Sequence, residues 1–276
     1  MTHGNNTTDD LRFAFGKNWQ SFLGRLNDTR IQEAERSLSD MLETDRLDGR
    51  SLLDIGSGSG LFSLAARRLG ASVRSFDYDA DAVACARELK RRYFSEDSRW
   101  LIEQGSVLDE DYVRSLGQFD IVYSWGVLHH TGNMWKALEN AAIPVQCPGG
   151  LLCIAIYNDQ GSRSERWKAV KRLYCRMPRP GKALLLALCA VRLWGPTIVK
   201  DTLRLHPLRT WSNYIRRRGM SPWHDVVDWV GGYPFEVATP EAIFRFYRDR
   251  GFRLRNLATA GGSIGNNRFV FEREPT

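Results

Sequence analysis

Between residues 51 and 157 the chain alternates short apolar runs with helical patterns, and this alternation is its strongest constraint on the fold. The apolar runs that we interpret as buried strands are 52–55, 72–77, 100–104, 119–124 and 151–157. The helical patterns between them fall at 61–69, 80–93, 109–116 and 133–142. Parallel strands need a crossover connection, which is usually a helix. The sequence therefore predicts a parallel sheet with helices on both faces.

The two ends of the chain add further elements to this pattern. Apolar residues at helical spacing predict a helix over 28–44. Near the C-terminus, Thr239-Pro240-Glu241 opens a helix, and two strands follow at 252–258 and 268–273. Their short, glycine-rich link requires them to be antiparallel neighbours. The predicted fold class is α/β: a Rossmann-like, seven-stranded, mostly parallel sheet with an antiparallel last strand.

Residues 161–235 interrupt the alternation and contain no strand pattern. Fifteen Lys and Arg residues lie in 161–220 against two acidic residues, although the whole chain carries a net charge of only +7. The apolar stretch 183–199 is too short to cross a bilayer, which needs about 20 apolar residues. We predict an N-terminal helical segment over 1–47 that serves as a lid. A Rossmann-like domain over 48–160 and 236–276 and a mainly helical, acceptor-binding insertion over 161–235 complete the chain.

A glycine cluster, Gly56-Ser57-Gly58-Ser59-Gly60, follows the first strand. Glycine lets the backbone turn sharply and approach a ligand closely. Asp77 ends the second strand, where a carboxylate can accept hydrogen bonds from both hydroxyls of a ribose. NAD is disfavoured, because Leu61 stands where the dinucleotide fingerprint needs a small residue, and Asp54 would repel a phosphate. Asp54 suits the cationic end of a ligand instead.

Five segments in order resemble the motifs of class I S-adenosylmethionine-dependent methyltransferases, particularly small-molecule members such as the ubiquinone and menaquinone biosynthesis enzymes. The segments read LLDIGSGSG, FDYD, EQGSVLD, FDIVYSWGVLHHT and PGGLLCIAIYND. The resemblance covers about 48–160 and, more weakly, 239–273. It implies S-adenosylmethionine as the cofactor. The residues that it assigns to the cofactor are Phe15, Trp19, Asp54, Gly56, Ser57, Gly58, Gly60, Asp77, Tyr78, Ser106, Val107, Trp125 and Gly126.

The resemblance also gives these residues their roles. Asp54 and the glycine cluster line the methionine end, Asp77 holds the ribose, and Tyr78 flanks the adenine. Ser106 and Val107 meet the edge and the face of the adenine, and Trp125 lies under the cofactor. The N-terminal aromatic residues close over the site, or else they dock a helix by packing alone.

Two adjacent histidines, His129 and His130, follow the fourth strand at the edge where open α/β sheets bind ligands. A histidine there can act as a general base for an acceptor that must lose a proton. The alternative is that the VLHH segment shapes the loop and caps the next helix. Asn158 and Asp159, after the fifth strand, are expected to face the acceptor. No residues have the spacing of metal ligands, so we expect catalysis without a metal.

The basic insertion is open to several interpretations: a membrane-surface contact, a lid over a bulky apolar or anionic acceptor that Arg216 helps to bind, an RNA-binding face, or a solvated face. We predict a cytoplasmic enzyme that methylates a small molecule, at oxygen rather than nitrogen or carbon. One alternative is an RNA methyltransferase, although SWGVLHH replaces the proline-rich motif of many base-methylating enzymes. The others are a methyltransferase acting on a lipid or quinone at a membrane, and a non-catalytic cofactor-binding subunit.

Overall fold

The chain divides into two compact units in the computed structural model, which describes Phe13, Leu23 and residues 26–206, 209–212, 222–263 and 265–275. One unit, called the helical unit here, comprises residues 1–13 and 161–235. The other, called the sheet unit, comprises residues 14–160 and 236–276. The division falls where the strand alternation of the sequence stops and resumes.

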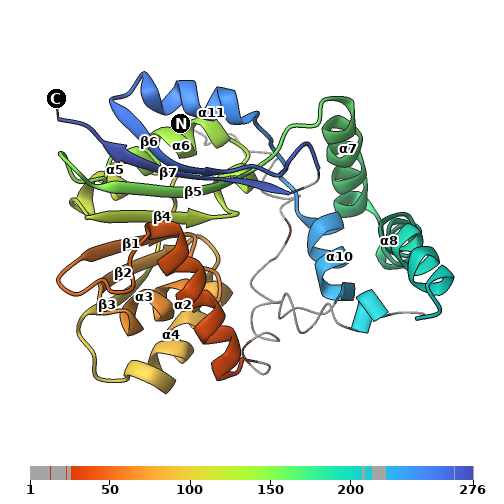
Figure 1. The fold of residues 1–276 in the computed structure, drawn as a ribbon, viewed down its shortest axis with the longest axis horizontal. Helices are drawn as coiled ribbons and strands as arrows, with labels where there is room; N and C mark the ends of the chain where they lie inside the picture. The colour runs from red at the N-terminus through yellow and green to blue at the C-terminus, as the bar shows by residue number, and fades with distance from the viewer. Residues whose placement is uncertain are drawn as a thin grey trace, which may run out of the picture. The chain divides into compact units, whose positions relative to one another are not determined.

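The sheet unit contains seven strands with helices on both faces (Figure 1). Its elements are α2 (Asp28–Leu42), β1 (Ser51–Ile55), α3 (Leu61–Arg68), β2 (Ser72–Asp77), α4 (Ala80–Phe94), β3 (Trp100–Gln104), α5 (Glu110–Ser115), β4 (Ile121–Trp125), the 3-10 helix η2 (Leu128–His130), α6 (Met134–Ala142), β5 (Leu151–Tyr157), α11 (Pro240–Arg248), β6 (Phe252–Ala258) and β7 (Asn266–Arg273). The strand order is β3-β2-β1-β4-β5-β7-β6, and β7 alone runs in the direction opposite to the other six strands. The predicted fold class is confirmed.

The strand boundaries differ from the prediction where pairing, rather than apolar sequence, defines the strand. β7 begins at Asn266, two residues before the predicted start, because Asn266 pairs with Tyr157 at the end of β5. β4 begins at Ile121 and not at Phe119, because Phe119 forms only an isolated bridge with Val145 outside the strand. The apolar pattern therefore missed the first two residues of β7, because they are polar.

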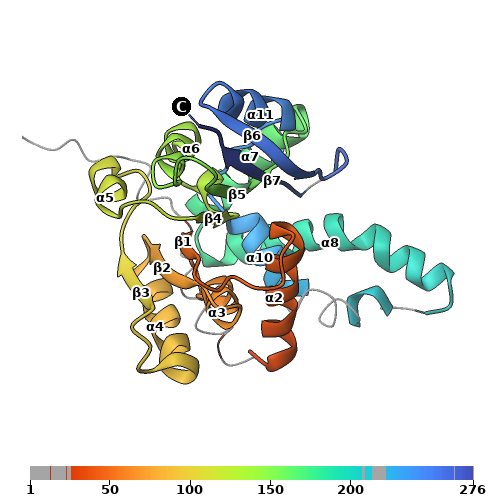
Figure 2. The same ribbon diagram turned by 60° about the vertical axis from the view of Figure 1, so that its left-hand side comes forward.

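Alternate side chains of the central strands enter two separate cores, one on each face of the sheet. The helices that cover the two faces can be followed in Figure 2. Leu53 and Ile55 of β1 pack with residues of α6 and α11, and Leu52 packs with residues of α2, α3 and α4. Because both faces are covered, the strands are apolar on both sides and show no polar alternation. This explains why they appear as continuous apolar runs in the sequence.

The strand order reverses between β1 and β4, since β2 and β3 continue to one side and β5 to the other. Ligands of open α/β sheets bind at such a switch point, beyond the carboxyl ends of the strands. The loops that follow β1, β2 and β4 therefore define where the functional site should lie.

The helical unit contains α7 (Ser162–Arg176), α8 (Arg179–Leu203) and α10 (Pro222–Gly231). Its core joins Tyr174 of α7, Leu186 and Cys189 of α8, and Val226 and Val230 of α10. Among the described residues, α8 is the one helix long and apolar enough to cross a membrane by length and composition. The helical content predicted for the insertion is what the structure shows.

Lys171 does not lie on the exposed basic face that we considered for this segment. Its side chain is fully buried, and its ammonium donates a hydrogen bond to the carbonyl oxygen of Trp229. The same Nζ lies 4.2 Å from the Trp229 ring centroid and 4.7 Å from that of Phe235. Burial lowers the pKa of this lysine to about 7.

Tyr247→Phe tests how firmly α11 is held on the sheet unit. The Tyr247 side chain is fully buried, and its hydroxyl donates a hydrogen bond of 2.9 Å to the carbonyl oxygen of Leu138 in α6. Loss of that bond should lower the free energy of unfolding by about 1 kcal/mol, measured by urea denaturation. Arg248→Gln on the same helix, whose side chain is exposed, is the control and should change it by less than about 0.5 kcal/mol. Equal effects of the two substitutions would contradict this account.

Candidate active site

The glycine loop after β1 is held against the end of β2 and against the loop after β4. The backbone N–H groups of Gly56 and Ser57 donate to the carbonyl oxygen of Phe76 in β2, at 2.8 and 3.1 Å. Gly56 adopts φ +73°, and a Cβ there would lie 2.4 Å from Cγ1 of Val127. A side chain at this position is excluded by both backbone conformation and space. Three loops thus meet at the predicted switch point.

Asp77, predicted to hold a ribose, lies in this junction. Its carboxylate accepts hydrogen bonds from the N–H groups of Gly58 and Asp79, both at 2.9 Å. Burial raises the pKa of this carboxyl, and the two backbone hydrogen bonds oppose the rise. A carboxylate accepts about four hydrogen bonds, so acceptor positions are left for a ligand. Tyr78, next in sequence, is half exposed, as a residue that flanks a bound ring requires.

Asp54 occupies the end of β1 with its side chain almost completely buried. Ser63 of α3 donates a hydrogen bond of 2.6 Å to its carboxylate. Burial raises the pKa of Asp54 from 3.8 to about 7, against the effect of the Ser63 hydrogen bond and with an added contribution from the charge of Asp77. The ionised carboxylate is therefore poorly stabilised in the absence of a cation.

The segment after β3 is fixed by local hydrogen bonds. The hydroxyl of Ser106 accepts from the N–H of Leu108 at 3.2 Å, and the carbonyl oxygen of buried Val107 accepts from Nδ2 of Asn140 at 2.8 Å. These contacts hold the turn that the resemblance assigns to the adenine. The role of Ser106 and Val107 toward a cofactor stays a prediction.

Trp125, the last residue of β4, packs in a row of aromatic side chains. Its ring centroid lies 6.2 Å from that of Tyr123 and 6.1 Å from that of Phe62, with nearly parallel planes. These rings belong to the core on the α2 side of the sheet. Gly126 follows with φ +73°, and its N–H donates to the carbonyl oxygen of Ala155. The indole is thus fixed at the end of β4, against Phe62 of α3.

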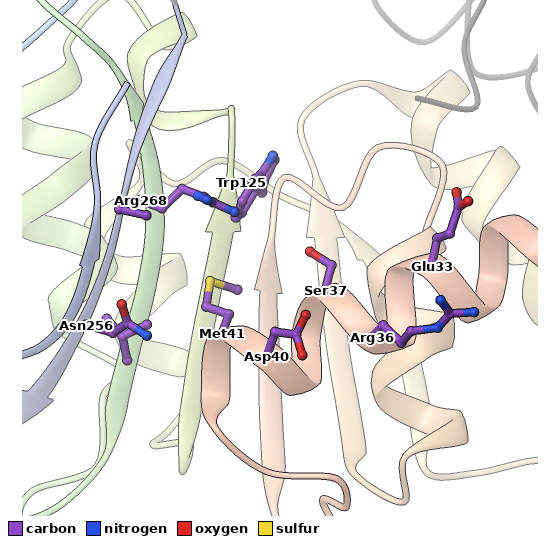
Figure 3. Close-up of a pocket in the computed structure, with 10 residues that line it drawn as sticks. Glu33, Arg36, Ser37, Asp40, Met41, Trp125, Asn256 and Arg268 are labelled. Atoms are coloured by element: carbon purple, nitrogen blue, oxygen red, sulfur yellow. The ribbon is translucent and has the colours of Figure 1, made fainter. Parts of the chain in front are cut away.

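An open pocket of about 530 Å³ lies between α2 and the β6–β7 end of the sheet (Figure 3). The residues that line it are Glu33, Arg36, Ser37, Asp40, Met41, Trp125, Asn256, Ala258, Arg268 and Val270. Arg268 extends toward Trp125, with its guanidinium carbon 6.0 Å from the ring centroid. Trp125 lines this pocket and is also one of the residues predicted to contact the cofactor. The pocket was not predicted from the sequence, because β6 and β7 carry no recognised motif.

The two predicted histidines lie on η2 in different environments. His129 is fully buried, and its Nδ1 accepts a hydrogen bond of 3.3 Å from the N–H of Tyr157. The His129 ring also packs at 4.0 Å from the Tyr157 ring. His130 is half-buried and meets Tyr157 edge to face at 5.4 Å. The adjacent residues therefore differ in access to a ligand.

Glu236, which was not singled out in the sequence, holds η2 and α6 in place. Glu236 donates its backbone N–H to the carbonyl oxygen of His129, and its carboxylate accepts from the N–H of Met134 at 2.9 Å. An acidic group at the start of a helix is favourable because of exposed N–H groups and the helix dipole. The contact spans 102 residues of sequence, which leaves no local signal.

Asn158, predicted to face the acceptor, is engaged with the β6–β7 loop. Its Oδ1 accepts from Asn267 at 3.0 Å, and its Nδ2 donates to the carbonyl oxygen of Ser263 at 3.4 Å. Asp159 is half-buried, and its N–H donates to the carbonyl oxygen of Ala238. These bonds give Asn158 a structural role beside β5. Its predicted contact with an acceptor stays a prediction.

The remaining predicted site residues, Phe15, Trp19 and Arg216, lie outside the residues that the structure describes. Within the described ranges, no three His, Cys, Asp or Glu side chains are grouped so that they could hold a metal ion.

The pH dependence of stability should reveal the buried Asp54 carboxyl. Folding raises the pKa of Asp54 to about 7. Its contribution to the free energy of unfolding is therefore full below about pH 4 and is lost as pH rises toward 7. The free energy of unfolding of Asp54→Asn relative to the unsubstituted protein should therefore increase between pH 4 and pH 7. The increase should be on the order of a few kcal/mol, at about 1.4 kcal/mol per pKa unit. Denaturant titrations across this range measure it.

Asp120→Asn supplies a control of opposite sign. Burial opposes ionisation of Asp120, but hydrogen bonds from Ser51 and the charge of Arg50 outweigh it and lower the pKa. That carboxylate stabilises the folded state at neutral pH and loses its contribution as pH falls. The free energy of unfolding of Asp120→Asn, relative to the unsubstituted protein, should therefore fall as pH rises. If the free energies of unfolding of both variants changed with pH in the same direction, the raised pKa assigned to Asp54 would be wrong.

Known proteins share this fold and parts of this sequence. The crystal structure of magnesium protoporphyrin IX methyltransferase from Synechocystis PCC 6803 with bound SAH matches with a TM-score of 0.56 at 14% identity, over 96% of this chain and 97% of that one. Ubiquinone biosynthesis O-methyltransferase of Rhodopseudomonas palustris (strain BisB18) is 29% identical over 136 residues, 49% of this chain and 50% of that protein. Ribosomal protein L11 methyltransferase of Pediococcus pentosaceus is 52% identical over 48 residues, 17% of this chain and 15% of that protein. The chain thus spans half or less of these two relatives.

The profile of one protein family covers most of the chain. It is described as a methyltransferase domain, and it matches residues 26–219, from the start of α2 into the helical unit. This range includes the glycine loop, Asp54, Asp77 and the histidine pair. The sequence motifs, the strand order and the structural matches agree with it. The chain therefore belongs to the methyltransferase-domain family, and it shares its fold with a crystallised methyltransferase.

Proposed function

We propose that the protein transfers a methyl group from S-adenosylmethionine to a hydroxyl oxygen of a small molecule, with His130 as the general base. The observation that carries the proposal is the half-buried position of His130 on η2, directly after β4 and at the carboxyl edge of the sheet. A hydroxyl needs a base, because the oxygen must lose its proton as the new C–O bond forms. The named similarity to ubiquinone biosynthesis O-methyltransferases supports oxygen as the target atom.

His129 is unsuited to be the base, although it is adjacent in sequence. A backbone N–H can only donate, so the Nδ1 that accepts from Tyr157 is unprotonated and has its lone pair engaged. Its ring is also fully buried between Tyr157 and His130. His129 is therefore a positioning residue that fixes η2, and with it the direction of His130.

The described residues fit the cofactor at three points. Asp77 retains acceptor capacity for the ribose hydroxyls, and Asp54 is a buried carboxylate that gains stability from a nearby cation. Gly58 in the glycine loop carries no side chain, so a ligand can approach the backbone closely there. When bound, the cofactor supplies a methyl group on a positively charged sulfur.

The acceptor oxygen attacks that methyl carbon in line with the bond to sulfur. The C–O bond forms as the C–S bond breaks, the electron pair stays on sulfur, and His130 takes the hydroxyl proton. The products are a methyl ether and S-adenosylhomocysteine. Alignment of the reacting atoms supplies much of the rate, because the methyl group is already activated.

A screen with methyl-labelled cofactor tests the function directly. Phenols, catechols and aliphatic alcohols should be offered beside amines and RNA, and products identified by mass spectrometry. Labelled methyl ethers are the expected products. Label that enters amines or RNA, and never an ether, would replace this proposal with the corresponding alternative.

Asp77→Ala should weaken binding of S-adenosylmethionine roughly ten- to a hundredfold, measured by calorimetry. The ribose hydroxyls then lose hydrogen bonds to a charged acceptor, each worth about 1.5–3 kcal/mol. Asp81→Ala is the control, because Asp81 lies in the first turn of α4 and outside the glycine loop junction. Unchanged affinity in Asp77→Ala, with the fold intact by circular dichroism, would remove Asp77 from the cofactor site.

His130→Ala should lower kcat by about 10²–10⁴-fold, which is the usual contribution of a general base. The loss should shrink for acceptors with more acidic hydroxyls, because these need less help to lose the proton. Binding of S-adenosylmethionine should stay within about twofold of the original. A loss that is the same for all acceptors would indicate that His130 shapes the loop and does not take the proton.

A further inference from the structure

The solvent-facing side of α8 is apolar over several consecutive turns. Leu184, Leu188 and Val191 are 64%, 60% and 71% exposed. Their spacing of four and three residues places them on one face of the helix. Ala183 and Ala187, also exposed, fill the surface between them. A helix on the surface of a globular protein ordinarily presents charged and polar side chains to solvent.

The opposite side of α8 already has its partners within the helical unit. Leu186 and Cys189 are buried against Tyr174 of α7 and against Val226 and Val230 of α10. The exposed face is thus additional to the core of the unit. Exposed apolar surfaces of this kind mark sites of protein or membrane contact.

The apolar face continues toward the end of α8, where Val199 and Leu203 are exposed as well. From Ala183 to Leu203 it extends over roughly 30 Å of helix. Leu205, just after the helix, is also exposed. The surface is long and narrow, unlike the compact patch of a small ligand site.

Basic side chains accompany this face. Arg192 is exposed one turn beyond Leu188, Lys200 is exposed next to Val199, and Arg179 is exposed at the start of the helix. Long basic side chains can lay their apolar stems on a membrane and keep their charges among anionic headgroups. A second copy of the same basic surface would meet like charge, whereas an anionic surface is complementary.

α8 is unsuited to cross the bilayer, despite its length and composition. Arg192 interrupts the apolar sequence near the middle, and a charged residue at the bilayer centre is costly. The helix is also packed along one side on α7, which carries the exposed arginines Arg172 and Arg176. An orientation parallel to the surface keeps those charges in water.

We infer that α8 binds flat on the surface of an anionic lipid bilayer, with the face from Leu184 to Leu203 inserted among the headgroups and acyl chain ends. Trp194 of α8 packs on Trp211, at 4.7 Å between ring centroids. The insertion therefore depends on aliphatic side chains, with Arg192 and Lys200 beside the headgroups. The inference does not rest on the identity of the methyl acceptor.

Co-sedimentation of the protein with vesicles tests this inference. Binding is expected to vesicles of phosphatidylcholine containing phosphatidylglycerol, to weaken as salt rises, and to be much weaker with phosphatidylcholine alone. Leu188→Glu/Val191→Glu should reduce partitioning to the anionic vesicles roughly tenfold or more, because apolar insertion is replaced by repulsion. Leu101→Glu/Leu257→Glu makes the same charge change at two exposed residues of the sheet unit and should partition as the unsubstituted protein does.

Several outcomes would overturn the inference. These are no binding of the unsubstituted protein to anionic vesicles at low salt, or equal losses in the two double variants. A dimer seen by analytical ultracentrifugation without lipid, and lost only in Leu188→Glu/Val191→Glu, would assign the face to a second copy. RNA binding that survives this substitution, without vesicle binding, would assign the basic residues to nucleic acid. If the glutamate variant does not fold by circular dichroism, Leu184→Gln/Val199→Gln repeats the test on the same face.

Discussion

The close approach of the β1 and β4 loops is the constraint on which the site depends. Gly56 has no room for a side chain because Val127 lies against it, and its N–H is already bound to the carbonyl oxygen of Phe76. These contacts hold three loops at the point where strand order reverses. Asp54 precedes this junction, Asp77 follows Phe76, and η2 begins just after Val127. A shift of any one loop would therefore move a carboxylate or a histidine relative to the others.

The same junction places two carboxylates in a setting that opposes their ionisation. Asp54 and Asp77 both have raised pKa values because of burial, and the charge of Asp77 contributes to the rise at Asp54. Such burial destabilises the empty protein, and a bound cation offsets it. The sulfonium and the ammonium of S-adenosylmethionine provide positive charge of the kind that these carboxylates lack. Affinity for the cofactor and reduced stability of the empty site thus have a common physical origin.

Most of the sheet unit could be predicted from sequence, because its strands are buried on both faces and several of its helices begin at recognisable caps. Asn27, Asp79, Asp109 and Thr239 each accept a hydrogen bond from the first turn of the helix that follows. The contact of Glu236 with Met134 could not be predicted, because it joins residues far apart in sequence. Lys171 was equally hidden, since a lysine in a basic segment gives no local sign that aromatic rings will enclose it.

The histidine pair shows why a motif identifies the place of a site more readily than the role of each residue. Successive residues of a 3-10 helix point about 120° apart, so two adjacent side chains cannot face the same way. The sequence places both histidines after β4, but only packing decides which one turns inward. Here His129 turns inward, because the N–H of Tyr157 binds its Nδ1 and the ring of Tyr157 covers the buried imidazole. The inward histidine fixes the loop, and the outward one is left with the exposure that a proton acceptor needs.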